Sequence, residues 1–493
     1  MNEQPLAIGG FRDVLDFINR ADGRRRQGAG FVAVLALGGI FTDAYDFTSL
    51  GIGAVQLRQQ FHLLPLALGT LTSIMALGAL FGGLFGGYLT DRVGRFRMFF
   101  VNMLLFVVAT LVAAFAPGYG VLLIARFFMG VGVGLDFPVA MAFIAEYNSV
   151  ERKGGLINMW QAVWYIAGTI CFLFSLAMYG LGAGADLWRW AVGFGAVPAF
   201  IILVLRFFLM DESPLWEAAR GNLAAAARIL ERTYHVRTAV DPAVQAQFVE
   251  RRPHRESWTL YRQIFSRRYR LRTFQASLVS AMQSCEYYAV GFYLPSIALV
   301  LFGSGFAVAL AGSLVFNLFG IAGGTLQAGL TNRIGIRRLA MIGCGITIAA
   351  LLVLGLFGHT FPPLLGAVFI ALFIFGHSFG IGSQGLTLAA LSFPTSMRGA
   401  ASGFAQSITR VGSIVGFFFF PLLIAAVGLY STLLTLTVVP VIALVAILAI
   451  KWDPTRRDVD HEHAAGEVGS EPALTIPQQV RLEPPRERGV RRQ

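Results

Sequence analysis

Charged side chains are scarce in this sequence. They make up 13% of its 493 residues, about half the fraction of an average soluble domain, whereas hydrophobic residues make up 56%. From Leu339 to Met397 there is no Asp, Glu, Lys or Arg, and the hydrocarbon core of a membrane takes about 20 residues per helix. This scarcity excludes a soluble enzyme and predicts an all-α polytopic membrane protein.

Cysteine is scarce as well. Cys171, Cys285 and Cys344 all lie in apolar stretches and at no metal-ligand spacing, so we interpret them as small packing residues and expect neither a metal site nor a cofactor. No cleavable signal peptide is expected either, because the first 29 residues are polar and carry arginines at 24–26. The net charge of +12 accompanies no recognisable nucleic-acid module, which excludes nucleic acid as the expected partner.

The apolar runs predict twelve membrane-spanning helices. The charge-free stretch holds two of them, because it is interrupted by glycine and proline at 358–363. The predicted spans cover residues 30–57, 66–90, 98–116, 121–145, 156–179, 190–209, 273–301, 307–330, 339–358, 364–391, 399–427 and 430–450.

A short basic hinge occurs twice in the sequence. GGYLTDRVGRFR, from Gly86 to Arg97, lies between two apolar runs, and AGLTNRIGIRRL, from Ala328 to Leu339, repeats its glycine, Asp/Asn, arginine and glycine 241 residues later. A repeat this long indicates that one membrane bundle was built twice. We therefore predict two pseudo-symmetric six-helix bundles, which together form a pore or a carrier.

Basic residues mark the loops expected in the cytoplasm. The N-terminal segment holds five and the central segment holds twelve, whereas the opposite loops hold only Arg58 and Arg189. Both termini are therefore expected in the cytoplasm, in a plasma (inner) membrane protein that works as a monomer in the bilayer. The predicted parts are a cytoplasmic N-terminal segment (1–29), an N-terminal bundle (30–210), a cytoplasmic central loop (211–272), a C-terminal bundle (273–451) and a disordered cytoplasmic tail (452–493).

The two polar segments outside the bundles are expected to differ. Ser213 and Pro214 form an N-cap and first helical residue, so the central loop should contain short helices. The tail is rich in proline, glutamate and arginine and is predicted to be disordered. Its residues 460–463, DHEH, are interpreted as solvated rather than as a metal site.

Several motifs in one order resemble the major facilitator superfamily, in particular its sugar porters and its phosphate and aromatic-acid:proton symporters. GYLTDRVGRFR resembles the loop between helices two and three, and RFFMGVGVG the helix-four motif. AEYNSVERKGG and FPTSMRGAASG resemble the paired loops after helices four and ten, and DESPLWEAARG the segment after helix six. The resemblance covers residues 30–450 and implies two six-helix halves that transport a small molecule by alternating access.

This resemblance implies a cytoplasmic gate. In the family the motif acid, here Asp91, lies near a helix N-terminus of the other half and near the motif's arginines. Asn332 replaces this acid in the second copy, so an asymmetric latch is expected. The residues expected to form the gate are Asp91, Arg92, Arg95, Glu146, Arg152 and Arg398.

Inside the predicted spans, burial of an ion makes a functional role the default, and six charged residues there are singled out. Counting along the helices places Asp43, Asp136, Glu286 and Arg410 near mid-membrane and the remaining two nearer the outer face. Sugar porters pair an acid of helix one with the helix-four arginine, as Asp46 and Arg126 would here. The proton-coupling set is therefore predicted to be Asp43, Asp46, Arg126 and Asp136.

Substrate binding is predicted around Arg410, because a guanidinium matches a carboxylate or phosphate. Aromatic-acid porters carry an arginine at a similar site, and their DGFD motif resembles residues 43–46. If the substrate were neutral, Arg410 would instead pair with an acid such as Glu286. His377 is interpreted as a helix-contact histidine, because no acid lies on its helix. The other predicted pocket residues are Glu286, Gln161, Tyr45, Gln283, Tyr287 and Gln384.

Together these observations predict a proton-coupled symporter of a small organic anion, such as an aromatic acid or another carboxylate metabolite. Sugar remains an alternative because of DESPLWEAARG, and phosphate because Asp136 precedes Pro138 as an acid does in phosphate porters, although Phe137 replaces their tyrosine. Proton-driven export is a further alternative. A channel or a membrane sensor would belong to a different class, and neither polar segment resembles a signalling module.

Overall fold

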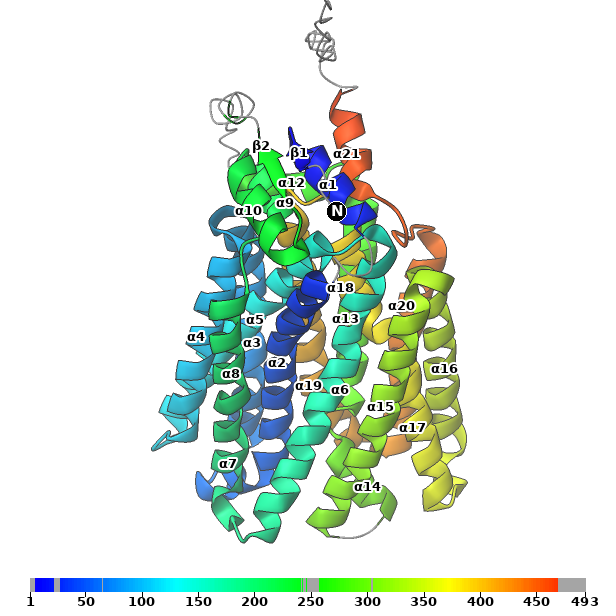
Figure 1. Cartoon of the computed structure of the whole chain (residues 1–493). Coiled ribbons are helices and arrows are strands. Elements are labelled where there is room, and N and C mark those ends of the chain that lie inside the picture. Colours follow the sequence, from blue (N-terminus) through cyan, green and yellow to red (C-terminus); the bar gives the residue numbers. More distant parts are fainter. Residues whose placement is uncertain are drawn as a thin grey trace, which may run out of the picture.

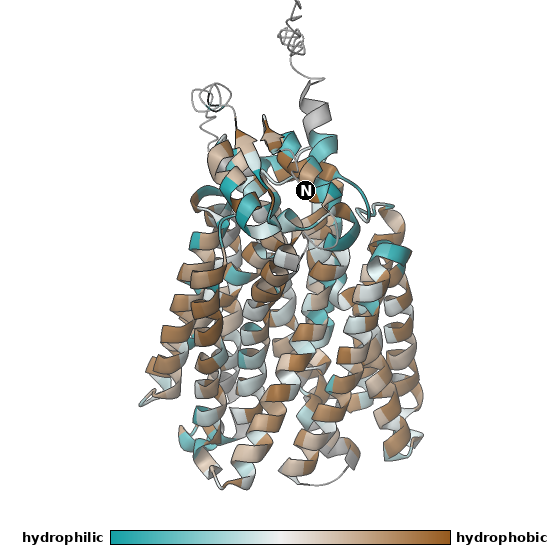
Figure 2. Ribbon diagram, viewed as in Figure 1, coloured by the Kyte–Doolittle hydropathy of each residue, from teal (hydrophilic) through white to brown (hydrophobic). Residues whose placement is uncertain are grey.

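The computed structural model describes residues 5–21, 27–63, 65–240, 242, 245, 257–302 and 305–468. Long helices run side by side along one axis, and short helices cover one end (Figure 1). Colouring by hydropathy shows that the long helices are mainly apolar, whereas hydrophilic residues concentrate among the short helices (Figure 2). The architecture is therefore that of a membrane bundle with a polar cap.

The first half holds six spans, as predicted. They are α2 (Gln27–Gln60), α3 (Pro65–Val93), α4 (Arg95–Ala114), α5 (Tyr119–Tyr147), α6 (Val150–Gly180) and a sixth built from η1 (Gly184–Asp186), α7 (Leu187–Phe194) and α8 (Ala196–Leu209).

The second half contains more interruptions. Its helices are α13 (Arg270–Val290), α14 (Leu294–Phe302), α15 (Phe306–Ile334), α16 (Ile336–Phe357), η2 (Gly358–Thr360), α17 (Pro363–Phe379), α18 (Ile381–Leu391), α19 (Arg398–Leu436) and α20 (Val438–Ala449). The predicted boundary between spans 399–427 and 430–450 corresponds to a kink within α19, at Gly428, where φ is 80°.

Eleven helical stretches in the described residues are long and apolar enough to cross a membrane. The predicted seventh span, 273–301, is not among them: residues 291–293 divide it into α13, which is long but less apolar, and α14, which has only 9 residues. The two pieces follow each other along the bundle and together occupy the place of that span (Figure 1). The prediction of an all-helical polytopic membrane protein is confirmed.

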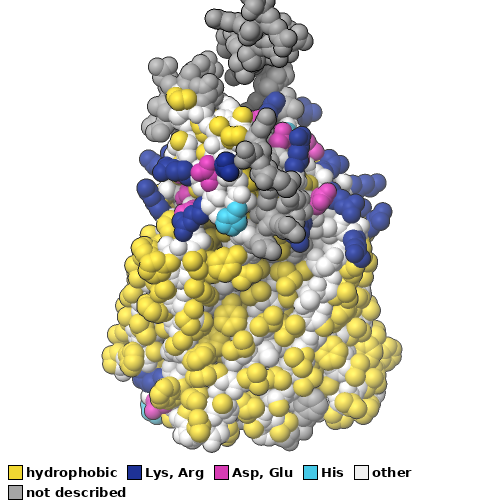
Figure 3. All heavy atoms as spheres, in the orientation of Figure 1, with side chains coloured by type: hydrophobic (Ala, Val, Ile, Leu, Met, Phe, Trp, Pro, Cys, Tyr) yellow, Lys and Arg dark blue, Asp and Glu magenta, His cyan; other side chains and the backbone are white. Residues whose placement is uncertain are grey.

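The outer surface separates apolar from charged side chains. Exposed Val101, Leu104 and Val108 lie on one side of α4, and exposed Ile124 and Phe128 lie on one side of α5. Such side chains form a broad apolar surface over the long helices, while Lys and Arg gather mainly at the end with the short helices (Figure 3). An apolar surface of this kind fits a lipid bilayer.

We call the polar cap the basic end, and it comprises α1 (Phe11–Arg20), α9 (Pro214–Ala219), α10 (Leu223–Tyr234), α12 (Ser257–Ile264) and α21 (Val459–Val468). Ser213 caps α9 by accepting a hydrogen bond from the Trp216 N–H, as its sequence predicts. Two short strands, β1 (Leu6–Ile8) and β2 (Thr238–Val240), pair in parallel there. The sequence analysis did not predict this pair, because three residues carry too little periodicity.

The prediction of a disordered tail from residue 452 is wrong for the part that the structure describes. Residues 459–468 form α21, and Asp460 is only 4% exposed. Asp460 is buried because it pairs with Arg398, a contact that composition could not indicate. Residues 469–493 lie outside the described residues.

Glycines bring α3 and α5 into close contact. A methyl group on Gly130 would overlap the carbonyl oxygen of Met75, and one on Gly134 would overlap that of Ala79. Small residues let helices approach in lipid, where packing replaces the hydrophobic effect. The glycine motifs of the sequence therefore mark real helix contacts.

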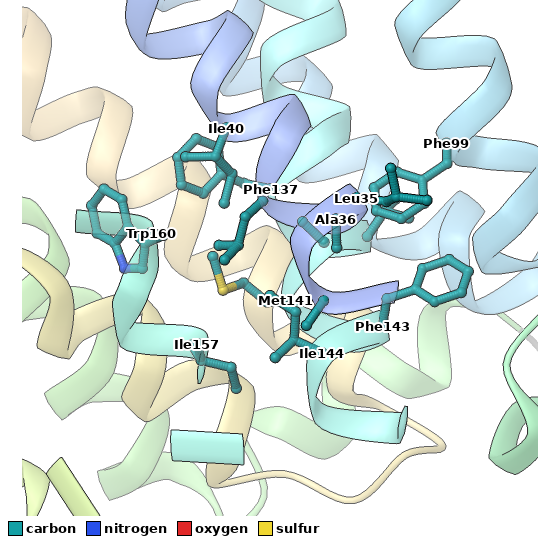
Figure 4. Close-up of a cluster of buried hydrophobic side chains, with 14 of the residues drawn as sticks. Leu35, Ala36, Ile40, Phe99, Phe137, Met141, Phe143, Ile144, Ile157 and Trp160 are labelled. Atoms are coloured by element: carbon teal, nitrogen blue, oxygen red, sulfur yellow. The ribbon is translucent and has the colours of Figure 1, made fainter. Parts of the chain in front are cut away.

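Large apolar side chains fill the first half on the side of α5 that faces α2, α4 and α6. Residues of all four helices meet in this cluster (Figure 4). Phe99 and Phe143 stack with ring centroids 4.8 Å apart, and Phe137 meets Trp160 edge to face at 5.5 Å. The first half is thus packed as one unit. Phe137 and Trp160 lie at its edge, on the side of the other half.

Gly130→Ala should destabilise the protein, because the added methyl group overlaps Met75 in the contact between α3 and α5. Overpacking of this kind costs about 1–3 kcal/mol of unfolding free energy. Gly120→Ala is the matched control, since it lies on the same helix and its methyl group would meet nothing within 4 Å. Thermal unfolding in detergent is the measurement. Equal Tm values for the two variants would contradict the close contact.

Candidate functional site: a central cavity with an unpaired arginine

A small cavity lies where the two halves meet. The first half contributes aromatic rings and one amide, and the second half contributes polar side chains from α13, α17 and α19. The lining residues are Phe137, Trp160, Gln161, Trp164, Gln283, Ser284, Tyr287, Tyr288, His377, Leu386, Gln406, Thr409 and Arg410. Of the predicted pocket residues, Arg410, Gln161, Gln283 and Tyr287 line it.

Arg410 is the cation of this cavity. It is 2% exposed, donates from Nη1 to the Tyr288 hydroxyl at 3.2 Å, and lies over the Phe47 ring at 5.1 Å. Its Nε has no hydrogen-bond partner, and no carboxylate of the described residues lies within ion-pair distance of it. Arg410 therefore has donors to spare for a ligand.

The other four buried arginines of the described chain all have acidic partners. Arg95 and Arg398 contact Glu146, Arg126 contacts Asp46, and Arg206 contacts Asp136. A buried charge is costly unless it is paired. Arg410 is the exception.

Asp46 and Arg126 form the ion pair that the family resemblance implies. Arg126 Nη1 lies 2.9 Å from Asp46 Oδ2, and both side chains are fully buried. The pair joins α2 to α5 within the first half. Asp46 Oδ1 and Arg126 Nη2 keep no further hydrogen-bond partner, so this pair is closed off from the polar network around it.

Asp43 differs from its neighbour three residues along α2. It is buried, its Oδ2 has no hydrogen-bond partner, and it makes no ion pair within the described chain. The charges of Asp136 and Arg410 nevertheless act on it, so it lies between the first half's ion pairs and the cavity's arginine. A carboxyl in this position is suited to bind a proton.

Asp136 is tied into the first half rather than exposed on the cavity. Its Oδ1 accepts from Arg206 Nη1 at 2.8 Å and from Asn102 Nδ2 at 2.9 Å. Arg206 also donates to the Leu35 and Ala36 carbonyl oxygens. This cluster links α2, α4, α5 and α8.

Glu286 pairs with His377 and not with Arg410. His377 Nδ1 lies 2.6 Å from Glu286 Oε1, and both side chains are buried. The sequence analysis interpreted His377 as a contact histidine because its own helix has no acid. The acid comes from α13, a neighbour that a single helix pattern cannot reveal.

Three predicted pocket residues lie away from the lining: Glu286, Tyr45 and Gln384. Tyr45 is buried beside Phe194, with ring centroids 5.7 Å apart. Gln384 donates to Gln327 and accepts from Asn158. Gln384 lies on α18, which the cavity touches at Leu386, whereas α2, which carries Tyr45, is not represented among the lining residues.

An ion network joins the halves at the basic end. Asp91 Oδ2 accepts from the Ala400 N–H at the start of α19 at 2.9 Å, and its Oδ1 lies 3.1 Å from Arg95. Arg95 also contacts Glu146 at 3.0 Å and donates to the Thr395 carbonyl oxygen. Carboxylate, helix N-terminus and guanidinium thus hold α3 and α4 against the second half.

The network continues into the tail. Arg398 lies 3.5 Å from Glu146 and 2.7 Å from Asp460, whose other oxygen accepts from the Thr395 N–H. Burial alone would raise the pKa of Asp460, but the charges of Arg398 and Lys153 outweigh it and lower that pKa below its ordinary value. Asp460 is therefore ionised at neutral pH.

Other members of the predicted gate take no part. Arg92 and Arg152 are exposed, and Arg92 donates only to the Tyr88 hydroxyl. Asn332, which replaces the acid in the second copy of the motif, has no partner for its Oδ1. The contacts of Asp91 thus have no counterpart at Asn332.

A sequence profile of the sugar (and other) transporter family matches residues 31–452. The chain belongs to this family. It is 28% identical to the inner membrane metabolite transport protein YgcS of Escherichia coli (strain K12), over 89% of this chain and 94% of that protein. It is 26% identical to the glucose transporter GlcP of Staphylococcus epidermidis, over 86% and 93%.

The fold agrees with that assignment. The proton:xylose symporter XylE superposes with a TM-score of 0.76 at 18% identity, over 89% of this chain and 98% of that one. This family membership confirms the predicted superfamily and makes the protein an integral membrane transporter of small molecules, not an enzyme. Secondary transporters generally bind their substrates at the interface of their two halves, and the central cavity lies at that interface.

Arg206→Gln should destabilise the protein strongly, because it leaves Asp136 buried without its cation. Breaking a buried pair costs about 3–5 kcal/mol. Arg189→Gln is the control, since its partner Asp186 is 60% exposed and such pairs contribute about 0–1 kcal/mol. Denaturant unfolding should also show recovery in Arg206→Gln with Asp136→Asn. Similar losses in the two arginine variants would show that the Asp136 pair does not hold α8.

Proposed function

We propose that this protein is a proton-coupled symporter of small organic anions that works by alternating access. Its basic end faces the cytoplasm, as the concentration of Lys and Arg there supports. Both termini then lie in the cytoplasm and the protein lies in the inner membrane, like YgcS by its name. It acts as a monomer.

The observation that carries the anion proposal is the unpaired guanidinium of Arg410 in the central cavity. Four other buried arginines have carboxylate partners, so an anionic substrate would supply the one that Arg410 lacks. A guanidinium binds a carboxylate in a two-pronged fashion. Gln161 and Gln283 would bind polar groups on the rest of the substrate.

Proton coupling is assigned to Asp43, Asp46, Arg126 and Asp136 in the first half. Asp46 can take a proton only when its contact with Arg126 loosens, whereas Asp43 has no ion pair to break. Asp136 would have to leave Arg206. Among these acids we therefore propose Asp43 as the one that is protonated first.

Alternating access would operate through the network at the basic end. Asp91, Arg95, Glu146 and Arg398 close that end in this structure. Substrate and proton enter from the opposite side, neutralise the cavity, and allow the halves to rock until these contacts break. Asp460 belongs to the closed state, because it holds Arg398.

Neutral sugar is the second candidate, and the comparisons favour it. GlcP is a glucose transporter and XylE a proton:xylose symporter by their names. The cavity also carries amides and aromatic faces, which suit hydroxyl groups and sugar rings. A hydroxylated carboxylate would satisfy both this wall and Arg410.

Uptake by proteoliposomes tests the proposal. With an inward pH gradient, D-gluconate or benzoate should accumulate, and without a gradient either should only equilibrate. D-glucose, D-xylose and phosphate are the matched comparisons. Gradient-driven uptake of the sugars without that of any carboxylate would refute the anion proposal and establish the sugar alternative.

Arg410→Lys should weaken binding of the transported anion, because a point charge replaces the fork, and Arg410→Gln should weaken it further. A charged hydrogen bond contributes about 1.5–3 kcal/mol, which corresponds to about a ten- to hundredfold loss of affinity. Arg232→Gln is the control, because Arg232 is 58% exposed and outside the cavity. Unchanged affinity in Arg410→Gln would contradict anion binding at this residue.

A further inference from the structure

The second half contains a buried acid–histidine pair that the proposed coupling does not use. His377 Nδ1 lies 2.6 Å from Glu286 Oε1, and the side chains are 1% and 0% exposed. Glu286 Oε2 has no hydrogen-bond partner among the residues that the structure describes. A proton shared at this distance can reside on either group, so the pair can gain or lose one proton as a unit.

The pair joins two interrupted helices close to their breaks. Glu286 lies four residues before the end of α13, beyond which α14 begins at Leu294. His377 lies in the last turn of α17, and Gly380, with φ −120° and ψ −102°, separates α17 from α18. A change in the protonation of the pair would therefore act next to two helix breaks, at which the second half can bend.

The pair also reaches the substrate cavity. His377 lines that cavity together with Arg410, and its ring stacks on Tyr287 with centroids 5.4 Å apart. A methyl group on Gly382 would approach both His377 Nε2 and Gln161 Nε2, so the second ring nitrogen lies on the side of Gln161. Glu286 thus acts behind His377, which faces the cavity.

Few other ionisable groups surround the pair. Arg410 comes from α19, Tyr165 from α6 and Cys344 from α16, while Cys285, Tyr287 and Tyr288 lie on α13 itself. Helices α14, α18 and α20 contain no ionisable side chain, α17 contains only His377, and the ionisable residue of α15 is Arg333 at its end. In the first half, Asp43 is close enough to Arg410 for their charges to interact, although it is not among the residues that line the cavity.

Formal charges then link the proton to an anion. With a proton, the pair is neutral overall, and Arg410 gives this half of the site a charge of plus one. Without the proton the pair carries a charge of minus one. This negative charge offsets the positive charge of Arg410, so the site attracts an anion less strongly. An anion therefore binds best when the pair is protonated, and its binding draws a proton onto the pair.

We propose that Glu286 and His377 form a second proton-binding site, in the C-terminal half, which takes up one proton when an anionic substrate binds to Arg410. This site is separate from the carboxyls of α2 and α5. The inference rests on the proposed anion transport, and it places a second proton-binding site in the half that carries Arg410. Glu286 acts as a positioning residue, because it reaches the substrate only through His377 and the charge they share.

Calorimetric titration of the full-length protein in nanodiscs tests this site. Binding of D-gluconate and benzoate is measured in buffers of different ionisation enthalpy, which yields the number of protons taken up per anion bound. The wild-type protein should take up about one proton more per anion than Glu286→Gln does, and its affinity should fall by up to about tenfold more per pH unit above the pKa of the pair. Glu286→Gln imitates the protonated acid, so this extra proton uptake and this part of the pH dependence should vanish, while any proton bound by the carboxyls of α2 and α5 remains.

Glu286→Asp is the conservative variant, which keeps a titratable acid and should retain proton uptake. If Glu286→Gln does not fold, Glu286→Asp still tests the inference, because it should shift the pH at which the affinity for the anion begins to fall. Undiminished proton uptake in Glu286→Gln, or carboxylate binding by the wild-type protein without proton uptake, would overturn this inference and leave anion transport intact. Failure of both carboxylates to bind, with D-glucose bound, would instead overturn the anion proposal itself.

Discussion

The cost of burying charge in a membrane governs this structure. Inside a bilayer an ionised side chain needs a partner of opposite charge or a proton that neutralises it. Asp46, Asp136 and Glu286 each have a cationic or titratable partner on another helix. Against that background, Arg410 and Asp43 stand out as charges without an ion pair among the described residues. Arg410 lines the cavity between the halves and Asp43 interacts with its charge, so an anionic substrate and a proton would complete the pairing.

The ion pairs fall into two classes with different mechanical consequences. Pairs such as Asp136 with Arg206 join helices of one half, and they make each bundle rigid. The contacts of Asp91 with Ala400 and of Glu146 with Arg398 join the two halves at one end. In the proposed mechanism, rocking of rigid bundles would break only the second class. The reversible interactions would then lie at the basic end, and the substrate would bind in the middle.

Much of this arrangement could be predicted from the sequence, because helix length and apolar runs dictate the spans, and the pairing of Asp46 with Arg126 follows from a motif. Other features could not. His377 and Glu286 meet from helices far apart in the sequence, and Arg206 was missed although it is a charge in a predicted span. The burial of Asp460 depends on a contact with Arg398 that tail composition does not encode. Tertiary contacts decide which buried charges of the described residues are paired and which are not.

The most direct test of this account is an experimental structure with D-gluconate bound, determined by cryo-electron microscopy at a resolution that resolves side chains. The account predicts the carboxylate of the ligand within hydrogen-bond distance of the Arg410 guanidinium, between the aromatic wall of α6 and the polar wall of α13. A structure in which Arg410 pairs with a carboxylate of the protein itself, such as Asp43, and the ligand lies elsewhere would contradict it.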